Sequence, residues 1–146
     1  MRLSRYSFSH EVPVPPEVAW EVVADHRGMT RWTPFRRARL ETEGQPPPNG
    51  VGAVRSLQLV GPPVRERVTA FEPPRRLAYE MLSGAPVRDY VGEVTLEPKA
   101  AGTLITWRVE LRPRFPGAEL AVREVIRRAA RSLAKECAER PHPGPV

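Results

Sequence analysis

Two oppositely charged residues, Arg55 and Glu66, lie in the middle of segments with the alternating pattern of strands. Glu66 has the same parity as the apolar Val68, and Arg55 has the same parity as Leu57. A charge on the inward face of a strand must be paired or must serve a site. We therefore expect Arg55 and Glu66 to meet on neighbouring strands of a hairpin, either as a partly buried salt bridge or as the polar anchor of a pocket.

Aromatic residues occupy the apolar faces of further segments. Tyr79 shares its face with Met81, and Tyr90 and Trp107 also follow the apolar parity of their segments. Such residues form either plain core or the wall of a cavity, where tyrosine hydroxyls can orient the oxygens of a ligand. Arg88 lies beside a turn with parity opposite to its apolar neighbour, so we expect it to be solvent-exposed or to lie at the rim of the pocket.

The sequence contains no motif that favours binding of a metal or a nucleotide. The histidines His10, His26 and His142 are far apart, and no His or Cys pair has the spacing of a metal site. There is no glycine-rich phosphate loop and no Gly-x-Ser-x-Gly motif. We interpret Asp25 and His26 as a helix cap and a surface histidine, and Cys137 as a small core residue. We expect neither a metal nor a cofactor.

Seven segments with strand character would position these side chains. They are residues 6–12, 37–43, 51–60, 64–71, 77–82, 87–96 and 103–111. Pro-rich and Gly-rich turns, such as Gly61-Pro62-Pro63, separate the later ones. Connections this short favour antiparallel neighbours, because a parallel crossover needs about a dozen residues or more.

Helical patterns flank the strands. A helix beginning at Pro16 follows the first strand, and a turn or one-turn helix then runs to Trp32. A long amphipathic helix runs from about residue 118 to 140 after the last strand. Its apolar stripe consists of Val122, Val125, Ile126, Ala129, Ala130, Leu133 and Cys137.

This long helix is the only element large enough to cover the apolar face of the sheet. The sheet is too wide to be covered flat, so we expect it to curl around the helix and leave a cavity. Small inward residues, Ala129 and Ala130, favour a ligand-sized space there. The predicted fold is an α+β helix-grip fold in one domain, residues 1–140, followed by a disordered tail, residues 141–146.

Several short motifs follow one another along residues 5–140. They are Val14-Pro15-Pro16-Glu17-Val18-Ala19-Trp20, Trp32-Thr33-Pro34, Glu66-Arg67-Val68, Phe71-Glu72-Pro73-Pro74-Arg75-Arg76-Leu77-Ala78-Tyr79, Tyr90-Val91-Gly92, and Gly102-Thr103 leading to Thr106-Trp107. In order and spacing they resemble the SRPBCC superfamily, which includes START lipid-transfer domains and plant allergen-type carriers of hydrophobic ligands. The resemblance is strongest to its polyketide cyclase/dehydrase-like group. It implies a helix-grip fold with Trp32 at the pocket entrance. Pro15 departs from the pattern, in which a small or capping residue often precedes Pro-Glu.

Composition narrows the possible partners and the compartment. The net charge is +6, but the basic residues are scattered and not interleaved with aromatic residues, so we expect a solvated surface rather than a nucleic-acid site. No apolar run is long enough to cross a membrane, and we expect no stable membrane insertion. The lack of a signal-peptide pattern and of paired cysteines favours the cytoplasm. We expect a monomer or a homodimer.

Three functions follow from these expectations. The first is binding of a small hydrophobic molecule, a polyketide, a lipid or an aromatic compound. The second is a cyclase or dehydratase that uses Glu66 and Tyr79 or Tyr90 as acid and base, with Arg55 holding an enolate or carboxylate. The third is a protein-interaction module with a filled core. The candidate ligand-binding residues are Trp32, Arg55, Glu66, Tyr79, Met81, Arg88, Tyr90, Trp107, Ala129 and Ala130.

Overall fold

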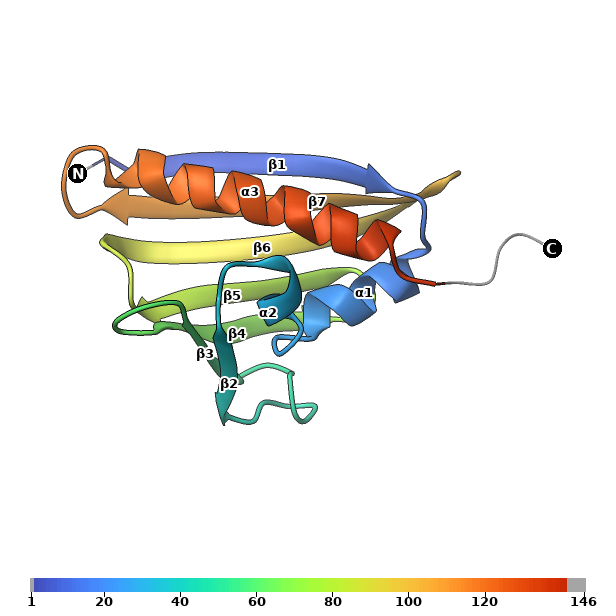
Figure 1. Ribbon diagram of the computed structural model, residues 1–146, viewed down its shortest axis with the longest axis horizontal. Helices are drawn as coiled ribbons and strands as arrows, with labels where there is room; N and C mark the ends of the chain where they lie inside the picture. The colour runs from blue at the N-terminus through green and yellow to red at the C-terminus, as the bar shows by residue number, and fades with distance from the viewer. Residues whose placement is uncertain (1, 142–146) are drawn as a thin grey trace.

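A seven-stranded antiparallel sheet with one long helix on its inner face forms the scaffold (Figure 1). The computed structural model describes residues 2–141, so the predicted tail lies outside the described residues except for Pro141. The elements in chain order are β1 (Ser4–Val12), α1 (Pro16–Ala24), α2 (Met29–Trp32), β2 (Arg37–Thr42), β3 (Val54–Gln58), β4 (Val64–Glu72), β5 (Arg76–Ser83), β6 (Val87–Lys99), β7 (Gly102–Pro113) and α3 (Ala118–Ala138).

The strands lie in the spatial order β1-β7-β6-β5-β4-β3-β2, and every neighbouring pair is antiparallel. Strands β2 to β6 each pair with the next one in the chain, as expected for short connections. Helices α1 and α2 carry the chain from β1 at one edge of the sheet to β2 at the other (Figure 1). This arrangement confirms the predicted helix-grip fold.

Helix α3 lies along β1 and β7 and also contacts α1 and α2 (Figure 1). Its buried residues include Ile126, Ala130, Leu133 and Cys137, which recur every three or four positions and form one stripe. Val125 was predicted to belong to this stripe, but it is 57% exposed. The prediction was wrong because Val125 points about 100° away from Ile126 around the helix.

A bulge in β6 decides which of its side chains face inward. The pairing of β6 with β7 shifts between Arg88 and Val91, and Asp89 has a positive φ of 51°. Val87 and Tyr90 are therefore both buried, although their parities differ. Arg88 lies between them in the chain and is exposed.

The largest differences from the predicted strand boundaries are in β3 and β6, and the ends of the other strands lie within two residues of the prediction. β3 is shorter because Gly52, with a φ of 92°, turns the chain before it, and Leu59, beyond its end, is 46% exposed. β6 is longer and continues through Pro98. Its pairing with β5 ends at Thr95, so Pro98 has only β7 beside it and its missing N–H interrupts no ladder with β5.

A glycine in the middle of the sheet leaves room for an aromatic ring. Gly92 on β6 pairs with Tyr79 on β5. A Cβ atom at Gly92 would lie only 2.3 Å from Cζ of Tyr79. The ring of Tyr79 therefore lies over a position that must lack a side chain, and this close approach fixes where its hydroxyl points.

We expect Gly92→Ala to lower the free energy of unfolding by about 1–3 kcal/mol, the usual cost of overpacking a core. The cost should shrink when Tyr79 is also replaced by Leu, because the clash is with the Tyr79 ring. Urea denaturation of the two single variants and the double variant measures both quantities. An equal cost in both backgrounds would contradict this account.

Candidate functional site

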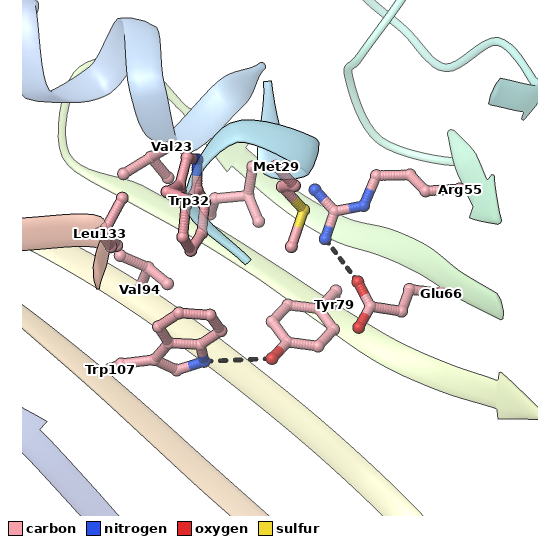
Figure 2. A pocket seen from close by; sticks show the side chains of 10 residues that line it. Val23, Met29, Trp32, Arg55, Glu66, Tyr79, Val94, Trp107 and Leu133 are labelled. Atoms are coloured by element: carbon pink, nitrogen blue, oxygen red, sulfur yellow. Dashed lines mark hydrogen bonds and ion pairs between the residues drawn. The ribbon is translucent and has the colours of Figure 1, made fainter. Parts of the chain in front are cut away.

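A pocket lies between the inner face of the sheet and helices α1, α2 and α3 (Figure 2). Apolar side chains from the helices form one wall, and aromatic, apolar and charged side chains from the sheet form the other. The lining residues are Val23, Met29, Trp32, Arg55, Glu66, Leu77, Tyr79, Val94, Trp107 and Leu133. The volume of the cavity is about 30 Å³.

This cavity is smaller than the ligand-sized space predicted from the alanines of α3. It has room for one or two water molecules, whereas a typical ligand pocket holds about 300 Å³ or more. Ala130 is buried in the core and Ala129 is half-buried against it, and neither lines the cavity. Leu133 is the residue of α3 that lines the pocket, and Met29 and Trp32 of α2 line it from the neighbouring helix (Figure 2).

Arg55 and Glu66 form a buried ion pair, one of the two alternatives that their parity left open. They are directly opposite each other in the β3–β4 register. Nη2 of Arg55 donates to Oε1 of Glu66 at 2.6 Å, and the two side chains are only 6% and 9% exposed. The Arg55 guanidinium also lies over the ring of Tyr79, 5.6 Å from its centroid. A charged group thus borders an otherwise apolar and aromatic pocket (Figure 2).

The Arg55 guanidinium retains unused hydrogen-bonding capacity. Its Nε is buried and has no hydrogen-bond partner in the part of the chain that the structure describes. A buried donor without an acceptor is costly, and in native proteins it is usually satisfied by water or a ligand. An acceptor oxygen on a bound molecule would satisfy it.

Three aromatic side chains form a hydrogen-bonded chain beside this pair. Nε1 of Trp107 donates to Oη of Tyr79 at 3.1 Å, which leaves the Tyr79 proton free to reach Oη of Tyr90 at 3.2 Å. Burial raises the pKa of Tyr79 and of Tyr90 well above the ordinary value, and the Glu66 carboxylate raises that of Tyr79 further. Both tyrosines therefore remain protonated near neutral pH and can donate hydrogen bonds, but they are poor bases.

Of the predicted site residues Trp32, Tyr90, Met81 and Arg88, only Trp32 lines the pocket. Trp32 lines the pocket and packs edge-on against Trp107, with ring centroids 6.4 Å apart. Tyr90 is buried behind Tyr79 and is not a lining residue. Met81 is partly buried against the core, opposite Glu66 in the β4–β5 register. Arg88 is exposed and does not border the cavity.

His26 was predicted to lie at the surface, and this prediction was wrong. His26 is only 4% exposed, and its Nδ1 lies 3.0 Å from Oδ1 of Asn49 in the loop between β2 and β3. Burial, and then the nearby Arg55 guanidinium, lower its pKa below the ordinary value. Sequence parity carries no information about a residue in a turn, so the contact with a loop 23 positions away was not visible in the sequence.

A surface ion pair connects α2, which forms part of the pocket wall, to α3. Nε of Arg31 lies 3.3 Å from Oε1 of Glu136, and the Arg31 side chain is half-exposed. Exposed ion pairs of this kind contribute little to stability. Helix α2 is a single turn of four residues and takes no part in the pairing of the sheet.

Residues 2–141 also bear on metal, thiol and membrane chemistry. No group of three or more His, Cys, Asp or Glu side chains there could hold a metal ion. Burial raises the pKa of the Cys137 thiol to about 12, so this buried residue is not a reactive thiolate. None of the described helices is long and apolar enough to cross a membrane.

A protein-family model described as polyketide cyclase / dehydrase and lipid transport matches residues 5–138. A search of curated protein sequences gives no significant match. The family match covers every strand except the first residue of β1, as well as all three helices.

Many solved structures share the fold. Ara h 8.0201 has a TM-score of 0.76 and 12% identity, and the match covers 95% of this chain and all of that chain. The Zhui aromatase/cyclase from Streptomyces sp. R1128 has a TM-score of 0.75 and 22% identity, with 93% and 94% covered. Norcoclaurine synthase from Thalictrum flavum, in complex with dopamine and hydroxybenzaldehyde, has a TM-score of 0.72 and 15% identity, with 97% and 90% covered. At these identities the likeness is one of fold.

We expect Arg55→Met to lower the free energy of unfolding by about 3–5 kcal/mol, because it leaves the Glu66 carboxylate buried without its partner. The double variant Arg55→Met/Glu66→Leu should recover most of this loss, since it removes the buried charge as well. Guanidinium denaturation measures both.

A matched control is available next to Glu66 in the same strand. Arg67 pairs with Glu80 at the surface, so Arg67→Met should have a small effect. If the double variant were no more stable than Arg55→Met alone, the unpaired carboxylate would not be the cause.

Proposed function

Because the chain belongs to the polyketide cyclase / dehydrase and lipid transport family, we propose that it binds a small hydrophobic molecule, aromatic at least in part, in the pocket beneath α2. The observation that carries the proposal is the buried Arg55–Glu66 pair at the edge of an aromatic and apolar pocket. A buried ion pair gives little net stability over apolar residues of the same size. Its presence beside a pocket therefore favours a role in recognition.

The lining defines the chemistry of the ligand. Trp32, Tyr79 and Trp107 offer aromatic surfaces, while Val94 and Leu133 are apolar. The unpartnered Nε of Arg55 calls for an acceptor oxygen, such as that of a carbonyl, a phenol or a carboxylate. The ligand that fits is a ring system with at least one such oxygen. The aromatic compounds in the norcoclaurine synthase complex support this class.

Binding requires the pocket to open. A cavity of about 30 Å³ does not hold an aromatic ring, so Met29 and Trp32 must move outward when the ligand enters. These two side chains belong to α2, the four-residue helix held to α3 by a half-exposed ion pair. The free energy of this opening is subtracted from the affinity.

Catalysis of a cyclase or dehydratase type is a second candidate. The observation in its favour is the neighbourhood of a carboxylate, Glu66, and a phenol that keeps its proton, Tyr79. Tyr79 would donate a proton, and Glu66 would accept one while Arg55 holds the developing oxyanion. Loss of turnover in Glu66→Gln, once a substrate is found, would support this role, and unchanged turnover would exclude it.

A protein-interaction module is a third candidate, which the nearly filled interior favours. It predicts that the pocket stays closed to every small molecule. A measurement of small-molecule binding distinguishes the interaction module from the first two candidates, which both predict binding.

We expect protein purified without denaturation to carry a hydrophobic compound that native mass spectrometry detects and identifies. Val94→Phe should abolish this binding, because the larger side chain fills the pocket. Val91→Phe is the matched control, since Val91 is in the same strand but 46% exposed and should leave binding intact. The proposal fails if no compound is retained and an added small aromatic carbonyl compound, benzamide, does not bind either.

A further inference from the structure

His26 is buried next to the pocket, although it is not one of the lining residues. Its carbonyl oxygen accepts a hydrogen bond from N of Met29 at 3.2 Å, and Met29 lines the pocket. Its ring forms a hydrogen bond with the side chain of Asn49. The residue after Asn49, Gly50, accepts a hydrogen bond from N of Ala53, which lies two residues before Arg55. Two loops thus hold the imidazole close to the start of β3, near the Arg55 guanidinium.

The hydrogen bond with Asn49 defines the tautomer of the neutral ring. Oδ1 of Asn49 can only accept, so Nδ1 of His26 carries the proton and Nε2 carries a lone pair. Nε2 is buried and has no hydrogen-bond partner among the described residues. His26 is therefore a buried, unprotonated base whose second nitrogen is free to accept a proton.

The charges around His26 are nearly balanced. Arg55 on β3 and Arg27 beside it disfavour the protonated ring, while Asp25 and the bond to Asn49 favour it. The charge of Arg55 is in turn compensated by Glu66 on β4. The buried cluster of a neutral His26 and the Arg55–Glu66 pair therefore has no net charge.

We infer that the pocket takes up an aromatic carboxylate together with one proton, and that His26 receives this proton. The inference rests on the proposed function and specifies the acceptor oxygen of the ligand as anionic. A carboxylate placed against Arg55 would leave one uncompensated negative charge in the cluster, and a buried unpaired charge is strongly unfavourable. Protonation of the unpartnered Nε2 of His26 restores neutrality without breaking the Arg55–Glu66 pair.

Linkage makes this coupling reciprocal. If a bound carboxylate favours protonation of His26, then protonation of His26 must favour binding of the carboxylate. Affinity should therefore rise as the pH falls, by at most about tenfold per pH unit for a single linked proton. The rise occurs between the pKa of His26 in the complex and the lower pKa of His26 in the free protein.

The experiment compares benzoate with benzamide, which has nearly the same shape but no charge. Isothermal titration calorimetry between about pH 5.5 and 8, where a carboxylate stays ionised, gives both affinities. Repeating each titration in buffers of different ionisation enthalpy gives the number of protons taken up. We expect uptake approaching about one proton per benzoate at the lower end of this range, a rising affinity as the pH falls, and neither effect for benzamide.

His26→Gln keeps a hydrogen-bonding side chain beside Asn49 but cannot titrate in this range. It should abolish proton uptake and flatten the pH profile of benzoate binding, while benzamide binds as before. His10→Gln is the matched control, because His10 is the other histidine within residues 2–141 and lies on β1. It should retain the full pH dependence.

A measurement on the unchanged protein covers the case in which His26→Gln does not fold. Benzoate should raise the pKa of His26 in an NMR titration of the histidine side chains, and benzamide should not. Benzoate binding without proton uptake, or uptake that persists in His26→Gln, as it would with Glu66 as the acceptor, overturns the inference but leaves the proposed function standing. If neither compound binds and the natively purified protein retains no compound, the inference and the proposed function both fail.

Discussion

Arg55 and Glu66 place two charges inside the sheet, and this pair constrains what surrounds it. The charges remain paired only if β3 and β4 keep their register, because a shift by one residue would turn one of the two side chains outward. The ring of Tyr79 lies beneath the guanidinium, and it occupies that place only because Gly92 lacks a side chain. Burial and the same guanidinium lower the pKa of His26, so its ring is sensitive to the charge at this pair. The glycine, the tyrosine, the histidine and the hairpin register therefore form one connected arrangement around a single ion pair.

The pair could be predicted because it depends on local rules. Side chains alternate along a strand, and Arg55 and Glu66 are placed symmetrically about the turn at Val60 and Gly61, so an antiparallel hairpin brings them opposite each other. The fold class follows from the same reasoning applied to all seven strands, together with the amphipathic stripe of the C-terminal helix. Where the alternation is interrupted, as at the bulge of Asp89, parity alone no longer assigns the faces.

The features that could not be predicted depend on contacts between distant segments. His26 lies in a turn without periodicity, and its burial comes from the loop that contains Asn49. The volume of the pocket depends on how far Met29, Trp32 and Leu133 reach into it, which the small size of Ala129 and Ala130 does not determine. Val125 was assigned to the wrong side of its helix because an apolar residue next to the stripe looks the same in sequence as one within it.

Helix α2 has a consequence for how pockets of this kind diverge. Met29 and Trp32 form one side of the cavity, yet their helix belongs to the connection between β1 and β2 and takes no part in the pairing of the sheet. Changes within these four residues can therefore reshape the cavity while the strand register, and with it the folding of the sheet, is inherited unchanged. Substitutions in α2 can therefore give two proteins with superimposable sheets pockets of different shape.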